Sequence, residues 1–362
     1  MAARYPYFAV EESSHGIRSG ESLAAALRRI LATPVARISA CLLLTLSAGA
    51  RSKAGVSDRF RWPAFLRAME IVLLLLIGLR NNRIQDFACC ACPKETFWRY
   101  SSYLIHWSLL IFSGFCVSAA RLGLPDVGLV SYGEMIDQGR LINEAVSIPV
   151  IGDGDNGYGN SMNIKRTIKG YINAGFAGIM LEDQVAPKAC GHTEGRKVIS
   201  REEAIVHIKA AVDARKESGS DIVIVARSDA RQAISLDEAL WRVKAFADAG
   251  ADVLFIDALA SVEEMKAFCV VAPEVPKMAN MLEGGGKTPI LSPAELEEIG
   301  FRLVVYPLSL VGVSMRAMQD ALVAVKDGGV PPPSILPSFQ EIKDTLGFNR
   351  YYKEEKQYQV VS

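Results

Sequence analysis

The chain has 362 residues, half of them hydrophobic, and its 40 basic side chains balance its 40 acidic ones. Because the net charge is zero, the sequence has no electrostatic preference for nucleic acid, and we expect no nucleic-acid partner. Seven cysteines at irregular spacing do not make a disulfide framework, so they favour reduced thiols and a cytoplasmic location.

The N-terminal part of the chain differs in character from the rest. Residues 1–20 are polar and unpatterned and predict a flexible arm, whereas residues 22–31 predict a short amphipathic helix. Residues 38–44 are a candidate buried strand. Residues 57–106 mix basic and aromatic side chains with an apolar run that is too short to cross a bilayer, so a membrane role is the weakest interpretation.

From Leu109 onwards, short apolar runs alternate with amphipathic helical stretches. The runs lie at 109–112, 148–151, 177–181, 222–226, 253–256, 278–282 and 303–306, and the helical stretches lie near 131–145, 162–174, 200–216, 235–249, 261–271, 292–299 and 309–326. Unbroken apolar strands that alternate with helices predict an α/β fold with a parallel sheet covered by helices. With residues 38–44 as the first strand, the strands number eight, which closes a (β/α)8 TIM-type barrel. A doubly wound open sheet is the alternative.

The C-terminal segment follows a glycine pair and then three prolines, Pro331 to Pro333, which predict a stiff extended linker. The last amphipathic stretch, 338–352, is expected to dock on the barrel or on a neighbouring subunit. The predicted organisation is therefore an arm over 1–20, a barrel over 21–329, and a linker with a docking helix over 330–362.

Acidic residues follow two neighbouring predicted strands. Asp153 and Asp155 come after the run 148–151, where glycines allow a tight turn, and Glu182 ends the next strand. Adjacent parallel strands lie roughly 4.8 Å apart, so these three acids can converge on one hard cation. Oxygen ligands in a loose cluster suit Mg²⁺. The alternative is that Asp-Gly-Asp-Asn-Gly is ordinary turn chemistry.

Other polar residues also fall where a barrel enzyme places its chemistry, at the C-terminal ends of strands. They are Ser113, Gly114, Arg227, Asp257, Asn280 and Glu283. The loop after Glu182 adds Cys190 between Lys188 and His192, a setting that lowers the pKa of a thiol. Cys190 is therefore a candidate proton donor or acceptor in a mobile lid, with a passive loop cysteine as the alternative.

At these residues the chain resembles the isocitrate lyase/phosphoenolpyruvate mutase superfamily, and most closely its plant carboxyvinyl-carboxyphosphonate phosphorylmutase-like and petal death protein-like members. The resemblance rests on the stretches 113–115, 122–126, 152–159, 181–183, 188–192, 225–227 and 280–289. It implies a (β/α)8 barrel that binds Mg²⁺, or Mn²⁺, and a small carboxylate substrate. It also implies a homo-oligomer, a tetramer or a dimer, with a swapped C-terminal helix.

The resemblance also assigns roles by position. The expected metal ligands are Asp153, Asp155, Glu182 and Asp126. The expected substrate-binding residues are Ser113, Gly114, Phe115, Tyr158, Asn280 and Glu283. The expected catalytic residues are Cys190, Arg227, Lys188 and His192.

Within the superfamily that this chain resembles, lyases and hydrolases have a cysteine in the lid, where the phosphonate mutases have an asparagine. In this chain the residue is Cys190. Cys190 therefore favours cleavage of a C–C bond in an α-keto or α-hydroxy di- or tricarboxylate, through an enolate that Cys190 protonates and Arg227 neutralises. This activity is similar to that of oxaloacetate hydrolases or methylisocitrate lyases. Phosphonomutase chemistry on phosphoenolpyruvate or carboxyvinyl-carboxyphosphonate is the alternative.

The chain departs from the family pattern before residue 113, where it uses far more residues between its first helix and its second strand. We interpret residues 57–106 as an atypical insert in the barrel. The alternative to an enzyme is a catalytically silent barrel that this insert disrupts. The likeness to plant proteins makes the chloroplast the alternative location.

Overall fold

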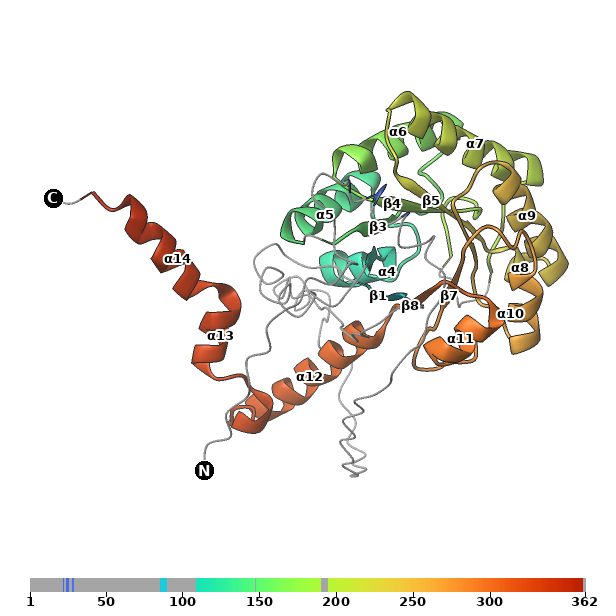
Figure 1. Cartoon of the computed structure of the whole chain (residues 1–362). Helices are drawn as coiled ribbons and strands as arrows, with labels where there is room; N and C mark the ends of the chain where they lie inside the picture. The colour runs from blue at the N-terminus through green and yellow to red at the C-terminus, as the bar shows by residue number, and fades with distance from the viewer. Residues whose placement is uncertain are drawn as a thin grey trace.

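The computed structural model describes residues 109–146, 148–189 and 195–360, the backbone of 85–89, and positions 22, 24, 25 and 28. Its eight strands are all parallel and close into a barrel in sequence order, with β1 paired to both β2 and β8 (Figure 1). The strands are β1 (Gln85–Cys89), β2 (Leu110–Phe112), β3 (Val150–Asp153), β4 (Gly178–Glu182), β5 (Val223–Ser228), β6 (Val253–Ile256), β7 (Lys277–Asn280) and β8 (Leu303–Tyr306). The predicted α/β barrel is confirmed.

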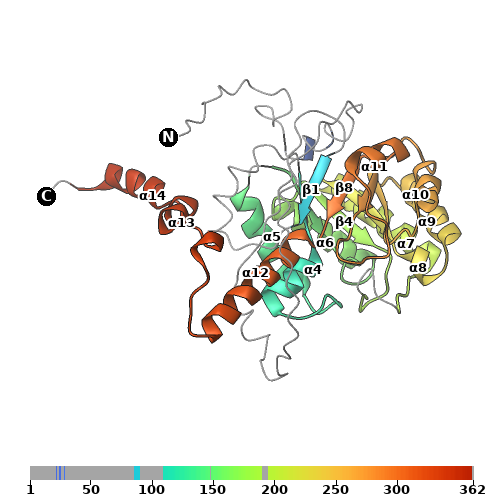
Figure 2. The same cartoon turned by 90° about the horizontal axis from the view of Figure 1, so that it is seen from below.

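An outer layer of helices covers the barrel (Figures 1 and 2). Its members are α5 (Tyr132–Ala145), α6 (Ser161–Asn173), α7 (Arg201–Glu217), α9 (Leu236–Asp248), α10 (Val262–Cys269) and α11 (Pro293–Ile299). Each lies within two residues of a range predicted from the periodicity. Three short elements that follow the C-terminal ends of β2 and β5 were not predicted. They are α4 (Gly114–Val117), the π-helix η2 (Ser118–Leu122) and α8 (Ala230–Ala233).

Side chains of the strands alternate between two apolar layers. Ile111, Val225 and Phe255 point into the barrel, in a cluster that also contains Ala24 near the N-terminus. Ile224 and Leu254 belong to the larger cluster between the strands and the helices. Burying each such side chain contributes about 1.5–3 kcal/mol to the stability of the fold. The two layers therefore fix the register of the strands, and with it the position of the residues at the strand ends.

The N-terminal residues that the structure describes lie beneath the barrel, at the end opposite the site. The guanidinium of Arg28 donates from Nη1 to Asp252 Oδ1 at 2.8 Å and from Nε to the carbonyl of Asp221 at 3.1 Å. These two acids precede β6 and β5. Ala24, Ala25 and Arg28 are helical, in agreement with the helix predicted at 22–31.

The first strand differs from the sequence-based expectation. β1 lies at 85–89, inside the range interpreted as an insert, while the candidate strand 38–44 lies outside the described residues. Gln85 is in register with Leu303 of β8, and Ala88 with Leu110 of β2. Parallel strands need a connection of about a dozen residues or more, and the chain between β1 and β2 is long enough. Periodicity alone does not locate so short a strand.

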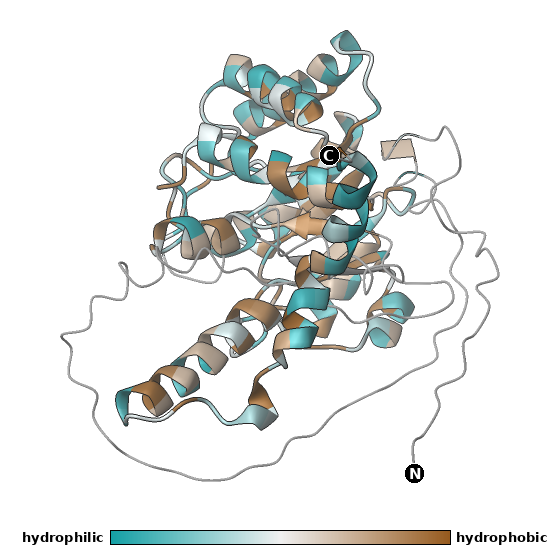
Figure 3. Ribbon diagram, turned by 90° about the vertical axis from the view of Figure 1, so that its left-hand side faces the viewer, coloured by the Kyte–Doolittle hydropathy of each residue, from teal (hydrophilic) through white to brown (hydrophobic). Residues whose placement is uncertain are grey.

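The C-terminal helices leave the barrel. After β8, α12 (Ser309–Lys326), α13 (Phe339–Leu346) and α14 (Phe348–Glu355) extend to one side, and none of their residues, all of them described, is buried (Figures 1 and 2). Figure 3 shows many hydrophobic residues along α12, whereas α14 is mainly hydrophilic. The predicted final helix over 338–352 is in fact two, because Gly347 adopts φ 92° between them. No helix among the described residues is long and apolar enough to span a membrane.

Candidate active site

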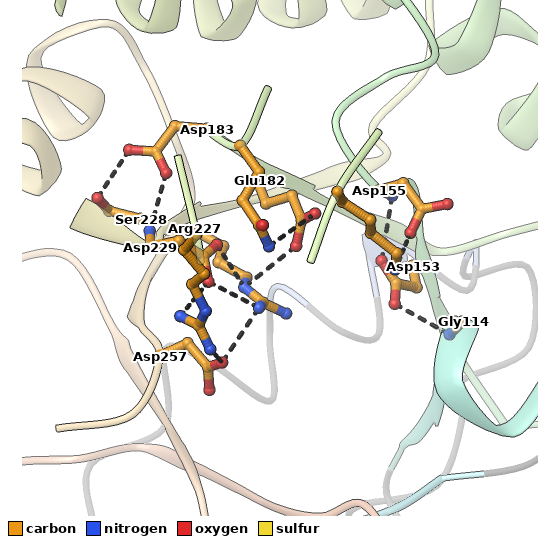
Figure 4. Close-up of polar contacts among 12 residues, drawn as sticks. Gly114, Asp153, Asp155, Glu182, Asp183, Arg227, Ser228, Asp229 and Asp257 are labelled. Carbon is orange, nitrogen blue, oxygen red and sulfur yellow. Dashed lines mark hydrogen bonds and ion pairs between the residues drawn. The ribbon is translucent and has the colours of Figure 1, made fainter. Parts of the chain in front are cut away.

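The C-terminal ends of β3 to β6 bring a set of charged side chains to one rim of the barrel (Figure 4). Asp153 ends β3, Glu182 ends β4, Arg227 lies one residue before the end of β5, and Asp257 directly follows β6. All four are nearly buried. Because the strands are parallel, their C-terminal ends meet at the same rim.

Asp153 organises the first half of the site. Its Oδ2 accepts from the amide of Gly114 at 2.9 Å, and its Oδ1 accepts from the amide of Asp155 at 3.1 Å. A Cβ at position 114 would lie 3.1 Å from Asp153 Oδ2 and 3.3 Å from Lys188 Nζ, so a larger residue would have to displace these side chains by a few tenths of an ångström. Gly114 is one of the expected substrate-binding residues, and in this structure its amide donates to Asp153.

Lys188 lies between two carboxylates of this half. Its Nζ donates to Asp126 Oδ2 at 3.0 Å and forms an ion pair with Asp155. Burial alone would lower the pKa of Lys188, but the surrounding carboxylates, Asp155 first, raise it well above its ordinary value. Burial raises the pKa of Asp155 to about 6 against the lowering effect of Lys188, with the charges of Asp153 and Asp126 adding to the rise. Lys188 is therefore a cation at neutral pH.

Arg227 organises the second half. Its Nε donates to Asp229 Oδ2 at 2.9 Å, and its Nη2 donates to Asp229 Oδ1 at 2.9 Å and to Asp257 Oδ2 at 3.1 Å. Its Nε also lies 3.3 Å from Glu182 Oε2. Burial raises the pKa of Glu182 well above its ordinary value, and Arg227 only partly offsets this. A guanidinium fixed by two carboxylates is a preorganised positive charge.

Asp183, which directly follows β4, holds Asp229 in place. Asp183 accepts from the Asp229 amide at 2.8 Å, from Ser228 Oγ at 2.7 Å and from Arg242 Nη1 at 3.2 Å. Burial raises the pKa of Asp183 to about 6, with the charge of Asp229 adding to the effect. This bonding fixes the turn after β5 that carries Asp229.

The remaining predicted residues are placed as follows. Ser113 and Phe115 are half-buried at the start of α4, on either side of Gly114. Asn280 donates from Nδ2 to Asp257 Oδ1 at 3.1 Å, which brings it into the second half of the site. Glu283 accepts from the amide of Leu308 at 3.1 Å.

Tyr158 packs against another aromatic side chain. Its ring lies edge-on to Tyr132 with centroids 5.6 Å apart, and its backbone has φ 62°. Burial raises the pKa of its phenol well above the ordinary value. These contacts describe a residue that packs against α5, whereas the resemblance implied a contact with substrate. Cys190 and His192 lie outside the described residues.

Three residues near the site were not assigned a role from the sequence: Arg196, Asp229 and Asp257. Asp257 was noted only as a residue at a strand end. Asp229 follows Arg227 by two positions, so a carboxylate within reach of the arginine was the available signal. Arg196 lies in a polar loop where no periodicity or motif indicates a buried side chain.

The sum of the charges at the rim tests whether the site suits a bound metal cation. Six carboxylates meet three cations, so the cluster has a formal charge of −3 if all are ionised. The carboxylates are Asp126, Asp153, Asp155, Glu182, Asp229 and Asp257, and the cations are Lys188, Arg196 and Arg227. Burial raises the pKa values of Asp155 and Glu182, and the charges of neighbouring carboxylates add to the rise. Oxygen-only donors with excess negative charge suit Mg²⁺.

The carboxylates do not form a preassembled cage. Among the described residues, no group of three His, Cys, Asp or Glu side chains is placed to chelate a metal ion. Mg²⁺ commonly takes one or two carboxylates and fills its remaining positions with water and substrate, so these residues fit such an ion without a cage.

Comparison with known proteins now identifies the family. A family model described as phosphoenolpyruvate phosphomutase matches residues 107–326. The chain belongs to this family, within the phosphoenolpyruvate mutase/isocitrate lyase superfamily of enzymes. The resemblance seen in the motifs is thus confirmed.

Three relatives of known name span most of the chain. The chain is 43% identical over 248 residues to 2,3-dimethylmalate lyase of Eubacterium barkeri, covering 68% of this chain and 84% of that protein. It is 38% identical to the petal death protein of Dianthus caryophyllus, covering 68% and 77%. It is also 38% identical to a chloroplastic carboxyvinyl-carboxyphosphonate phosphorylmutase of Arabidopsis thaliana, covering 68% and 73%.

Solved structures give the same answer for the fold. A crystal structure of 2,3-dimethylmalate lyase superposes with a TM-score of 0.70 at 31% identity, covering 76% of this chain and 90% of that one. Oxaloacetate acetylhydrolase with 3,3-difluorooxalacetate gives 0.69 at 29% identity, covering 76% and 91%. Phosphonopyruvate hydrolase with oxalate and Mg²⁺ gives 0.66 at 27% identity, covering 76% and 94%. The superfamily therefore includes both lyases and hydrolases among the chain's relatives.

Proposed function

We propose that this protein is a C–C bond lyase or hydrolase that acts on a small α-keto or α-hydroxy di- or tricarboxylate. The observation that carries the proposal is the pair of buried cations, Lys188 and Arg227, held by carboxylates at one rim of the barrel. Relatives named as 2,3-dimethylmalate lyase and oxaloacetate acetylhydrolase support the reaction class.

The residues of the chain divide the reaction between them. In an α-hydroxy acid, the hydroxyl group loses its proton and becomes the carbonyl group of one product as the C–C bond breaks; in an α-keto acid, water first adds to the carbonyl group. In both cases the electron pair of the broken bond moves onto the other fragment, where the adjacent carbonyl or carboxylate group holds it as an enolate. Arg227, fixed by Asp229 and Asp257, stabilises that negative charge without having to reorient. The amides of Ser113 and Phe115 at the open start of α4 remain candidates for binding the substrate carboxylate.

Cys190 is the proposed proton donor to the enolate carbon. It lies two positions after Lys188, whose cationic side chain is buried among Asp126 and Asp155. A nearby cation lowers the pKa of a thiol and keeps it reactive near neutral pH. His192 is the second candidate for proton transfer in the same loop.

Mg²⁺, with Mn²⁺ as the alternative, is the proposed cofactor, held by Asp153, Asp155, Glu182 and Asp126 directly or through water. When bound, it supplies Lewis-acid polarisation of the substrate's oxo or carboxylate oxygen. The negative charge of the rim supports this proposal, as does the Mg²⁺ in the related phosphonopyruvate hydrolase structure.

A second candidate function is phosphonate chemistry, because the family description and the Arabidopsis thaliana relative both name a mutase. Phosphorus NMR separates the two candidates. Incubation with phosphoenolpyruvate or phosphonopyruvate leaves the spectrum unchanged if the protein is a C–C lyase. A new phosphonate or phosphate signal that depends on the enzyme would favour the mutase class.

The assembly proposed here is a homo-oligomer, a tetramer or a dimer, in which α12 to α14 pack on a neighbouring copy. Val313, Val323, Phe339 and Leu346 on these helices expose 46–76% of their surface, which is costly to leave in water. Light scattering on the purified chain measures the oligomer. We place the protein in the cytoplasm, with the chloroplast as the alternative because one relative is chloroplastic.

The experiment that tests the reaction is a screen for C–C bond cleavage with Mg²⁺ present, read as release of a keto acid from the alkylmalates and alkylisocitrates and as release of oxalate from oxaloacetate. Substrates are oxaloacetate, alkylmalates and alkylisocitrates, and the control is Asp137→Asn, which changes an exposed carboxylate on α5. We expect release with at least one of these acids by the wild type and by the control. No release with any acid, in a folded oligomeric preparation, would contradict the proposal.

A further inference from the structure

Arg196 is a buried arginine beside the site, in the loop between β4 and α7. Its Nη1 lies 2.5 Å from Asp229 Oδ1, and its Nη2 lies 3.0 Å from Asp257 Oδ2. The Arg196 side chain is 1% exposed, and the two carboxylate side chains are 0% and 2% exposed. A buried guanidinium loses its hydration, so it stays in place only where carboxylates bind it.

The same two oxygen atoms also bind Arg227. Asp229 Oδ1 and Asp257 Oδ2 each accept from Arg227 Nη2, at 2.9 and 3.1 Å. Two guanidinium groups and two carboxylates thus form one closed set of ion pairs, part of which Figure 4 shows around Arg227. The position of Arg227 therefore depends on where Arg196 holds Asp229 and Asp257.

The backbone on either side of Arg196 is fixed as well. The amide of Val185 donates to the carbonyl of Lys197 at 3.0 Å, and the amide of Ile199 donates to the carbonyl of Asp183 at 3.0 Å. Gln184 and Val198 form an antiparallel bridge between the same two strands of chain. Arg196 therefore projects from a fixed backbone, which a positioning role requires.

We propose that Arg196 is a positioning residue that sets the orientation and the available charge of Arg227. The inference rests on the proposed function, in which Arg227 meets the negative charge of a carboxylate substrate. Three carboxylates, Glu182, Asp229 and Asp257, face the guanidinium groups of Arg196 and Arg227, and this set of five groups has a net charge of −1 if all are ionised. Without Arg196 the set has a net charge of −2, so Arg227 is drawn toward the carboxylates and an anionic substrate is repelled.

The test is a double-mutant cycle of Arg196→Gln and Arg227→Gln. Two properties are measured on the holoenzyme, kcat/KM for the best acid of the screen and the affinity for oxalate by calorimetry. We expect R196Q to lower kcat/KM and oxalate affinity by about tenfold or more, which lies within the range measured for groups in one ion-pair network. In the R227Q background, the same change should have less than about a twofold effect.

Two further variants keep the test decisive. Arg231→Gln removes a bidentate ion pair to Glu264 that lies outside the site, and we expect it to leave both properties unchanged. Arg196→Lys keeps the charge but not the two-pronged geometry, so it serves where R196Q does not fold. We expect a smaller loss with R196K, which again disappears in the R227Q background.

The outcomes separate the two claims. If the wild type turns over an acid and binds oxalate, but R196Q and R196K only lower the melting temperature, the role of Arg196 is overturned. An equal loss with and without Arg227 also overturns it, because Arg196 would then act independently of Arg227. A folded wild type that neither turns over any acid nor binds oxalate overturns the proposed function, and the carboxylate role of Arg196 with it.

Discussion

Asp155→Asn should stabilise the metal-free protein while abolishing its activity. Burial raises the pKa of Asp155 from 3.8 to about 6. Because this pKa is higher in the folded state, the stabilising effect is complete below about pH 4 and is lost as the pH rises through 6. At pH 7 the ionised carboxylate therefore costs the folded state about 3 kcal/mol, at about 1.4 kcal/mol for each pKa unit.

Asparagine has the shape of aspartate and no charge, so it removes this cost. Lys188 keeps Asp126 as an ion-pair partner at 3.0 Å, and no buried cation is left alone. We expect D155N to gain up to about 3 kcal/mol at pH 7 and about 1 kcal/mol at pH 4.5. The same variant should lose keto-acid release, because a proposed cation ligand is gone.

The assay is urea unfolding in EDTA at pH 7, 5.5 and 4.5, read as the midpoint at constant slope. Asp137→Asn on the exposed face of α5 is the matched control and should stay within about 0.5 kcal/mol of the wild type. Added Mg²⁺ should stabilise the wild type more than D155N. A D155N protein that is less stable than the wild type at pH 7 would refute the reasoning, because the ion pair with Lys188 would then outweigh the burial of the charge.

Three other predictions concern packing, proton transfer and assembly. Gly152→Ala places a Cβ 2.6 Å from the rings of Phe176 and Tyr171, so it should cost about 1–3 kcal/mol in urea unfolding; an unchanged midpoint would contradict this packing. Cys190→Ala should slow turnover by about 10²-fold or more without changing oxalate affinity, and full activity would make Cys190 a passive residue. Removal of residues 330–362 should reduce the oligomer measured by light scattering, and an unchanged mass would show that these residues do not hold it together.

The strands and helices after residue 109 were predictable because each buries an apolar face with a clear period. Asp153 and Glu182 were predictable in place for the same reason, since each stands where an apolar strand run ends. The first strand was not, because residues 38–44 and 85–89 are both short, and only pairing with β2 and β8 distinguishes them.

The contacts that fix Arg227 were not predictable. Asp229, Asp257 and Arg196 come from three different connections of the barrel, and their ion pairs form only when the sheet closes. The hydrogen bond from the Gly114 amide to Asp153 has the same origin, because residue 114 follows β2 and residue 153 ends β3. Sequence patterns report local burial, whereas these contacts depend on which strands become neighbours.

The most direct measurement is keto-acid release by the wild type after EDTA treatment and after readdition of Mg²⁺ or Mn²⁺, with Asp153→Ala alongside. If the rim carboxylates hold a divalent cation that the C–C cleavage needs, EDTA abolishes release, either ion restores it, and D153A stays inactive with both. Full release in EDTA, or normal release by D153A, would contradict a metal-dependent reaction at this rim.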